Sequence, residues 1–263
     1  VQCRFGSLYN VAGYEQEKSR KLLSDATMHY STKKDKSHHY LLHGDLAKSS
    51  VFAEIDAVPG VKGNITACHM QLPVDDAGFN IPEKLGVIID NVLKLDGLYK
   101  NFAMLIWCTD KQAADVLETM SKNQRFKKVE SHIAWITGGC ENKSTKAGVV
   151  IPQDYYRGYV GYAYSDAGEP ASGSLMKIGQ DRTRMHVAPS VGSTKLKYCS
   201  GALGPGVPYS FFKQHCNTND WILDLMCGLG SAAVAAAGLL INSISVDCNM
   251  PMVRFIYVSV DCF

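Results

Sequence analysis

Two acids and two glycines near the C-terminus have the types and the spacing to bind a small ligand. Residues 221–230 read WILDLMCGLG, which places Asp224 four residues before Gly228 and leaves Gly230 at the end. Glycines let a loop turn sharply and approach a ligand closely, and the amides that begin a following helix point at the same place. Asp247, 17 residues beyond Gly230, is placed to accept hydrogen bonds from a ribose diol. The pattern predicts a nucleoside site.

The same residues exclude two common phosphate-binding loops. No Lys-Ser or Lys-Thr pair follows the glycines, so this is not a Walker loop. A dinucleotide fingerprint would place a third glycine at position 233, which is alanine. An acid at Asp224 suits a cationic amino group better than a pyrophosphate. A nucleoside that carries an amino acid therefore satisfies both ends of the pattern.

A strand, a turn, a helix and a second strand must position these residues. The apolar residues before the glycines predict the first strand, residues 231–240 an alanine-rich helix, and residues 243–247 the second strand. From residue 40 onward, short apolar runs alternate with segments of helical spacing. This alternation predicts an α/β protein with a largely parallel sheet.

The remaining elements follow the same alternation. Strands are predicted at 40–43, 64–69, 102–108, 133–137 and 159–164, and helices at 81–95, 111–122 and 209–215, the second of these capped by Thr109 or Asp110. Residues 1–39 are polar and basic and predict a flexible or helical arm ahead of one domain at 40–263. Residues 165–206 show little periodicity and predict a long loop or insertion.

Residues 222–236, which read ILDLMCGLGSAAVAA, resemble motif I of S-adenosylmethionine-dependent methyltransferases. The resemblance is to the permuted, beta-class DNA amino-methyltransferases (adenine-N6 or cytosine-N4), which typically read LDPFCGSGTTAVAA there. In that class the catalytic half comes first and motif I lies near the C-terminus, as here. Residues 41–45, LLHGD, are similar to the family's strand ending in G-D. Pro208 lies where the family carries Lys-Pro ahead of motif I.

The resemblance implies a Rossmann-like methyltransferase fold: a mostly parallel seven-stranded sheet with helices on both faces and permuted motif order. It also implies that S-adenosylmethionine contacts a set of residues around the glycines, namely Asp224, Met226, Cys227, Gly228, Gly230, Asp247 and Pro208. Leu225 stands where the family has proline, and Leu229 where a small residue is usual. Binding of the cofactor and its loss therefore both stay open.

The family's catalytic element, D/N/S-P-P-Y/F/W, is degenerate in this chain. Its acid or amide and a backbone carbonyl accept hydrogen bonds from the target amino group, while its aromatic stacks on the extruded base. The corresponding strand runs into Cys68, His69, Met70 and Gln71, followed by Leu-Pro, without an acid, a Pro-Pro pair or an aromatic. His69 as a substitute base, and Asp75 or Asp76 as a displaced acceptor, are alternatives to a structural histidine and an acidic turn.

These observations predict a methyltransferase-like pseudoenzyme that works as a binding or scaffold subunit of a nucleic-acid or ribonucleoprotein assembly. The alternative is an active S-adenosylmethionine-dependent amino-methyltransferase acting on DNA or RNA. A third hypothesis is an unrelated nucleotide-binding α/β protein, in which the glycines would lie outside a strand, turn and helix.

Charge and cysteine content limit the partners. Lys and Arg number 27 against 25 Asp and Glu, a formal charge of +2, so only local patches favour nucleic acid, here Lys33, Lys34, Lys36, Arg157, Arg182 and Arg184. The nine cysteines form no CxxC pair and no metal-ligand cluster, which indicates an intracellular, reducing compartment: nucleus, cytoplasm or organelle matrix. The longest apolar run near the C-terminus, 232–241, is too short to span a bilayer, so no membrane partner is predicted.

Overall fold

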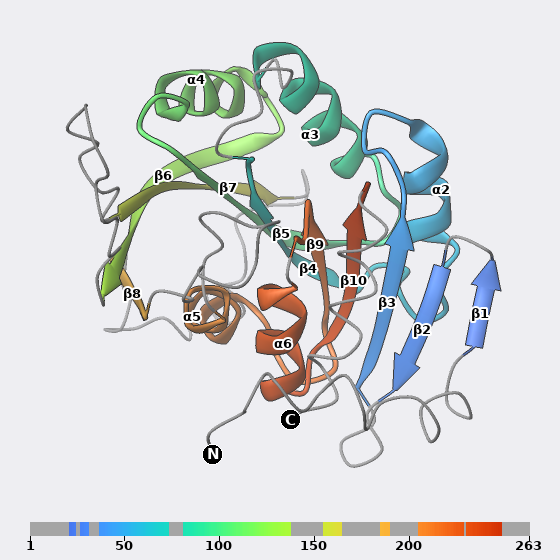
Figure 1. Ribbon diagram of the computed structural model, residues 1–263. Coiled ribbons are helices and arrows are strands. Elements are labelled where there is room, and N and C mark those ends of the chain that lie inside the picture. The colour runs from blue at the N-terminus through green and yellow to red at the C-terminus, as the bar shows by residue number, and fades with distance from the viewer. Residues whose placement is uncertain are drawn as a thin grey trace, which may run out of the picture.

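A single mixed sheet forms the centre of the computed structural model, which describes residues 21–24, 27–31, 37–73, 81–137, 155–164, 185–189, 205–228 and 230–248. Its strands are β1 (Lys21–Ser24), β2 (Thr27–Ser31), β3 (His38–His43), β4 (Ile65–Gln71), β5 (Leu98–Cys108), β6 (Phe126–Thr137), β7 (Tyr155–Tyr164), β8 (Met185–Pro189), β9 (Trp221–Leu225) and β10 (Asn242–Asp247). Within the described residues the strand order is β1-β2-β3-β10-β9-β4-β5-β7-β6-β8 (Figure 1).

Seven central strands reproduce the predicted sheet. Strands β3, β10, β9, β4 and β5 are parallel neighbours. Strand β7 pairs antiparallel with β5 on one side and with β6 on the other, so that it alone runs against the other six. The mostly parallel Rossmann-like sheet is confirmed, with β9 and β10, the strands of the glycine pattern, between β3 and β4.

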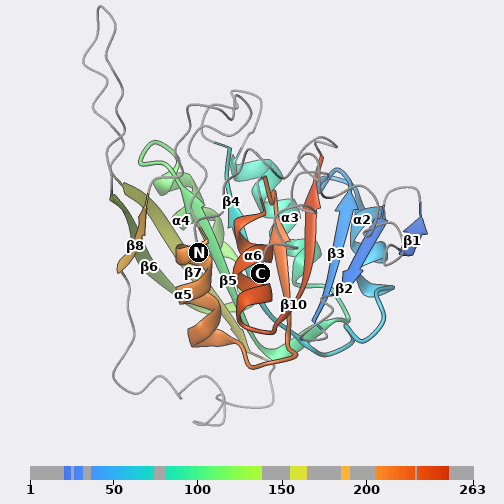
Figure 2. The same cartoon turned by 60° about the horizontal axis from the view of Figure 1, so that its bottom comes forward.

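Helices cover both faces of this sheet, as predicted. They are α2 (Ser49–Asp56), the π-helical turn η2 (Ile81–Leu85) that continues into α3 (Gly86–Val92), α4 (Ala113–Lys122), α5 (Gly206–His215) and α6 (Ser231–Gly238). Figures 1 and 2 show α5 and α6 on one face of the sheet and α2, α3 and α4 on the other. The two predicted helices after 81 and 111 are therefore confirmed.

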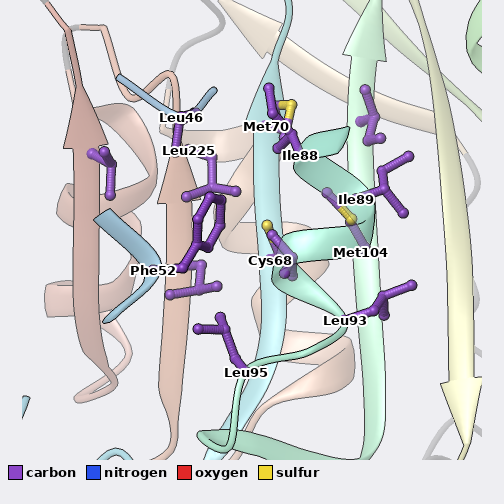
Figure 3. Packing of buried hydrophobic residues seen from close by; sticks show 14 of the residues in the cluster. Leu46, Phe52, Cys68, Met70, Ile88, Ile89, Leu93, Leu95, Met104 and Leu225 are labelled. Carbon is purple, nitrogen blue, oxygen red and sulfur yellow. The ribbon is translucent and has the colours of Figure 1, made fainter. Parts of the chain in front are cut away.

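Two buried apolar clusters, one on each face, explain why the central strands are continuous apolar runs. The cluster under α2, α3 and α4 contains Phe52, Ile89 and Met104 (Figure 3). The cluster under α5 and α6 contains Leu105, Phe211 and a row of α6 alanines. Because side chains alternate along a strand, β5 contributes to both clusters and must be apolar throughout.

The predicted N-terminal arm differs from the structure where it is described. Residues 21–24 and 27–31 form strands, and β2 pairs antiparallel with β3, Thr27 opposite Leu42. The physical reason is the edge of β3, whose backbone groups would otherwise lack partners in the sheet. The sheet thus begins before residue 40.

The predicted loop at 165–206 also contains a strand. Within it, β8 pairs parallel with the outer strand β6, Ile133 opposite Met185, and extends the sheet at its other edge. The helix predicted from 209 begins at Gly206. Residues 165–184 and 190–204 lie outside the described residues, as do residues 138–154 and 249–263.

Candidate functional site

The segment after β9 forms the predicted strand, turn and helix. Met226, Gly228 and Gly230 have left-handed backbone conformations, with φ of 56°, 49° and 73°. Glycine adopts such φ values without a steric penalty, which is why two of the three positions are glycine. The Gly230 amide donates to the Cys227 carbonyl at 2.7 Å, and Gly230 then caps α6. This geometry argues against the third hypothesis, in which the glycines lie outside such a turn.

Asp247 lies where β9 and β10 end side by side. The amide of Gly228 donates to Asp247 Oδ2 at 2.9 Å, and the amide of Cys227 donates to the Val246 carbonyl at 3.1 Å. The glycine loop is therefore hydrogen-bonded to the end of β10. Asp247 is half-buried, so its carboxylate lies at the surface of the loop beside the glycines, where the sequence predicts a ribose contact.

Asp224, the other acid of the pattern, is buried instead. Its side chain is 2% exposed, and its Oδ1 lies 3.1 Å from Nδ1 of His69, which is directly opposite it on β4. Because the carboxylate can only accept, Nδ1 carries the proton of this bond. Burial raises the pKa of Asp224, while the hydrogen bond from His69 and the nearby amide of Ala233 oppose the rise.

A row of polar side chains continues across the sheet at this level. His69, Asp224 and Ser245 are in register on β4, β9 and β10. His69 Nε2, Asp224 Oδ2 and Ser245 Oγ are buried without a hydrogen-bond partner among the described residues. The ring of Phe212 from α5 packs edge-on against His69, with centroids 6.3 Å apart. The row lies on the face covered by α5 and α6, beneath the beginning of the alanine helix.

The four residues predicted for the degenerate catalytic motif are separated by the pleat of β4. Cys68 and Met70 point into the cluster under α2 and α3 and are fully buried (Figure 3). Burial raises the pKa of the Cys68 thiol well above its usual value. His69 faces the opposite side of the sheet, bonded to Asp224. Gln71 is the one of the four that ends the strand, and Leu72 and Pro73 follow it.

Side chains of the next strand and helix hold this strand end in place. The amide of Leu72 donates to the Trp107 carbonyl at 2.9 Å, and Gln112 Nε2 donates to the Pro73 carbonyl at 2.9 Å. The Gln112 carbonyl oxygen in turn accepts from the Thr109 amide at 2.9 Å. The sequence analysis missed Gln112; its signal is a polar side chain directly before a helix. Asp75 and Asp76 lie outside the described residues.

The other predicted contacts are placed as follows. Pro208 is buried in the first turn of α5, and Cys227 is buried in the glycine loop. Arg157 is exposed on β7, and its Nε donates to Asp110 Oδ1 at 2.5 Å. The other predicted nucleic-acid contacts, Lys33, Lys34, Lys36, Arg182 and Arg184, lie outside the described residues, as does Leu229.

The described ranges contain no group of three or more His, Cys, Asp or Glu side chains arranged to hold a metal ion. Among the helices of the described ranges, none combines the length and the apolar character needed to cross a bilayer.

The chain matches no family model and no curated protein, but its fold matches solved methyltransferases. The complex of M1.HpyAVI with S-adenosylmethionine has a TM-score of 0.58 at 16% identity, covering 82% of this chain and 96% of its own. The cytosine-N4-specific PvuII DNA methyltransferase has a TM-score of 0.59 at 10% identity, covering 84% and 86%. TTHA0409 from Thermus thermophilus, complexed with S-adenosyl-L-methionine, has a TM-score of 0.59 at 13% identity, covering 82% and 90%.

These matches identify the fold. The chain has the fold of S-adenosylmethionine-dependent DNA methyltransferases of the beta class, as its motif I and motif order predict. At these identities the likeness concerns the arrangement of strands and helices.

Proposed function

We propose that this chain is a methyltransferase-like pseudoenzyme. Its glycine loop binds a nucleoside of the S-adenosylmethionine class, its strand end at Gln71 does not support methyl transfer, and it serves as a binding or scaffold subunit of a nucleic-acid or ribonucleoprotein assembly. Fold likeness alone does not establish function. Two regions support the proposal: the glycine half, which is the loop around Gly228 and Gly230 with Asp247, and the end of β4 at Gln71.

The glycine half supports nucleoside binding. Gly228 and Gly230 let the backbone come close to a ligand, α6 begins directly behind them, and the half-buried Asp247 carboxylate lies beside them. Two of the similar structures were solved with S-adenosylmethionine. When bound, that cofactor supplies an electrophilic methyl group. Asp247 would hold its ribose, and the loop backbone would lie against it.

The end of β4 is the observation that carries the loss of catalysis. The predicted degenerate motif at Cys68, His69, Met70 and Gln71 ends with the strand, and the chain continues with Leu72, Pro73 and Val74 where the family reads Asp-Pro-Pro-Tyr. The carbonyl of Pro73 already accepts a hydrogen bond from Gln112. Among residues 71–74 a flipped base would find neither a carboxylate acceptor nor a stacking ring. Methyl transfer depends on positioning the nucleophilic nitrogen, so losing both contacts removes most of the catalytic advantage.

The proposed partners are protein subunits and a nucleic acid. PvuII methyltransferase, which shares the fold, is a DNA methyltransferase. Arg157, the predicted contact that the structure describes, lies exposed at the same edge as the end of β5, paired with Asp110. A phosphate could compete with this exposed carboxylate for the guanidinium, because such surface pairs are weak.

Gln71 supports a second candidate function, an active amino-methyltransferase. It is an amide at the end of a strand whose neighbour, β9, leads into the glycine loop, with Met70 opposite Leu225. An amide oxygen can accept a hydrogen bond from a target amino group, and Pro73 keeps one of the two family prolines. This candidate predicts methyl transfer that Gln71→Ala abolishes.

Equilibrium dialysis with S-adenosylmethionine labelled in its methyl group tests the nucleoside site. We expect saturable binding to the wild type that Asp247→Ala weakens by roughly tenfold or more, since a charged hydrogen-bond acceptor is lost. Asp115→Ala, which removes an exposed acid on α4, is the matched control and should leave binding unchanged. Absence of saturable binding, or equal loss in both variants, would contradict the nucleoside site.

A further inference from the structure

Asp224 is unavailable to a ligand, and this restricts what the glycine loop can bind. Building on the proposed nucleoside site, we infer that the site accepts a nucleoside without selecting for a cationic amino-acid tail. The amino-acid end of S-adenosylmethionine then contributes little to affinity. This departs from the sequence-based expectation that Asp224 binds the ammonium group of the ligand.

The carboxylate of Asp224 is buried. Asp224 and His69 side chains are 2% and 4% exposed, and one Asp224 oxygen is held by His69 at 3.1 Å. The other oxygen is fully buried and faces no hydrogen-bond donor of normal geometry among the described residues, although the Ala233 amide stabilises its charge. The carboxylate therefore lies inside the protein, between β4 and the first turn of α6.

Freeing the Asp224 carboxylate from His69 would cost free energy. If Asp224 turned toward a ligand ammonium, the Nδ1–H of His69 would be left buried without an acceptor, in addition to its Nε2, which has no partner in the described part of the chain. A buried donor that loses its partner incurs its desolvation penalty. The ring also packs against Phe212, and the His69 side chain is 4% exposed, so little water is available to replace the lost acceptor. The hydrogen bond between Asp224 and His69 is thus more stable formed than broken.

Other acids lie near the same edge of the sheet. Asp45 follows β3, and its Oδ1 accepts the Ala47 amide at 3.0 Å. Asp110 follows β5 and is paired with Arg157. Asp247 is bonded to the glycine loop through Gly228. Within the described ranges Asp45 and Asp110 have partners of their own, and Asp247, which does lie beside the loop, is assigned to the ribose, so none of the three takes the place of Asp224.

A matched pair of nucleosides tests the inference directly. S-adenosylhomocysteine and 5′-methylthioadenosine share adenine, ribose and a neutral thioether, and differ in the charged amino-acid tail. Calorimetric titration of both into the wild-type chain should give dissociation constants within about threefold of each other. Asp247→Ala should weaken both alike. Asp224→Asn, which keeps an oxygen for His69 but removes the charge, should change the ratio of the two constants by less than about twofold.

Two outcomes would overturn the inference, and they differ. In the first, S-adenosylhomocysteine binds more than about tenfold tighter than 5′-methylthioadenosine, and Asp224→Asn abolishes that preference. Asp224 then binds the amino-acid tail, so the inference fails while the proposed nucleoside site stands. If neither nucleoside binds, the proposed nucleoside site fails and the inference fails with it. Circular dichroism of Asp224→Asn establishes that the variant is folded.

Discussion

The glycine loop and the end of β4 follow neighbouring strands of the sheet, yet they resemble the methyltransferase motifs to different extents. The loop keeps its left-handed glycines and the acid at the end of β10, in the geometry that its sequence predicts. The end of β4 lies next to β9 and reads Gln71-Leu72-Pro73, without an acid or an aromatic, and Gln112 holds its backbone. On the proposed function, the two regions therefore differ in what they can do: the loop has the geometry to bind a ligand, and the strand end lacks the side chains for methyl transfer.

His69 joins these two regions, because it is on β4 and bonds to Asp224 on β9. Removing one member of a buried pair leaves an uncompensated polar group, so His69→Ala should lower the free energy of unfolding by about 3–5 kcal/mol. Chemical denaturation measures this loss. In the Asp224→Asn background the same substitution should cost much less, and an equal cost in both backgrounds would show that the two residues are not coupled.

The cost of His69→Ala should also depend on pH. Burial raises the pKa of Asp224 in the folded protein, so the folded state binds more protons than the unfolded chain and stability falls as pH rises toward that pKa. Losing the opposing hydrogen bond from His69 enlarges this effect. The loss of unfolding free energy caused by His69→Ala should therefore be smallest at about pH 4, where carboxyl groups of the unfolded chain are partly protonated, and should grow toward neutral pH. A deficit that shrinks as pH rises would contradict the assignment.

Gly158→Ala perturbs the β4 side of the comparison. A Cβ at this position would lie 2.5 Å from the buried ring of Trp107, whose carbonyl accepts the Leu72 amide. Overpacking of this kind costs about 1–3 kcal/mol, measurable by thermal unfolding.

Gly161→Ala is the matched control for Gly158→Ala, because its Cβ would meet Phe126 at 2.7 Å, away from Leu72. Both variants should lose stability, but hydrogen exchange at Leu72 should accelerate more in Gly158→Ala. A large loss of nucleoside affinity in Gly158→Ala would show that the two regions are not independent.

Gly230→Ala perturbs the loop side. With φ at 73°, alanine would be strained by about 1–2 kcal/mol, and displaced loop amides should weaken nucleoside binding. Gly86→Ala in α3 is the control and should stabilise the protein. Its Cβ would meet only Thr119 at 3.9 Å, and alanine in a helix is more stable than glycine by about 0.5–1 kcal/mol. Unfolding midpoints should move in opposite directions, and equal shifts would argue against strain at 230.

Gln112→Ala should have the smallest effect. It frees the Pro73 carbonyl and the amide and hydroxyl of Thr109, all in part-buried hydrogen bonds, where each bond is worth about 1 kcal/mol and water that fills the space of the lost side chain replaces part of it. Nucleoside affinity should not change. Gln214→Ala, which loses one long contact to Ser210 at 3.4 Å, should be close to neutral in the same unfolding experiment.

The sequence predicts the glycine half well because its determinants are local. The glycines, the alanine helix and Asp247 all fall within 222–247, and their order alone implies a strand, a turn, a helix and a strand. The resemblance in that segment also predicted the mostly parallel seven-stranded sheet that the central strands form.

The sequence predicts the other half poorly because its determinants are distant. His69 and Asp224 are 155 residues apart, and neither residue type reveals that they meet. Helix α2 escaped prediction because Val51, Phe52 and Ile55 form too short an apolar pattern. Strands β1, β2 and β8 extend the edges of the sheet, where pairing is decided by free backbone groups and leaves little trace in the sequence.

The central claim is that a methyltransferase fold keeps its nucleoside site but transfers no methyl group. The most direct test incubates excess protein with S-adenosylmethionine tritiated in its methyl group and pools of DNA and RNA, then counts label in the nucleic acid. We predict counts equal to a protein-free blank for the wild type and for Gln71→Ala, while dialysis shows the label bound to both. Label in the nucleic acid that Gln71→Ala abolishes would contradict the account and establish an active enzyme.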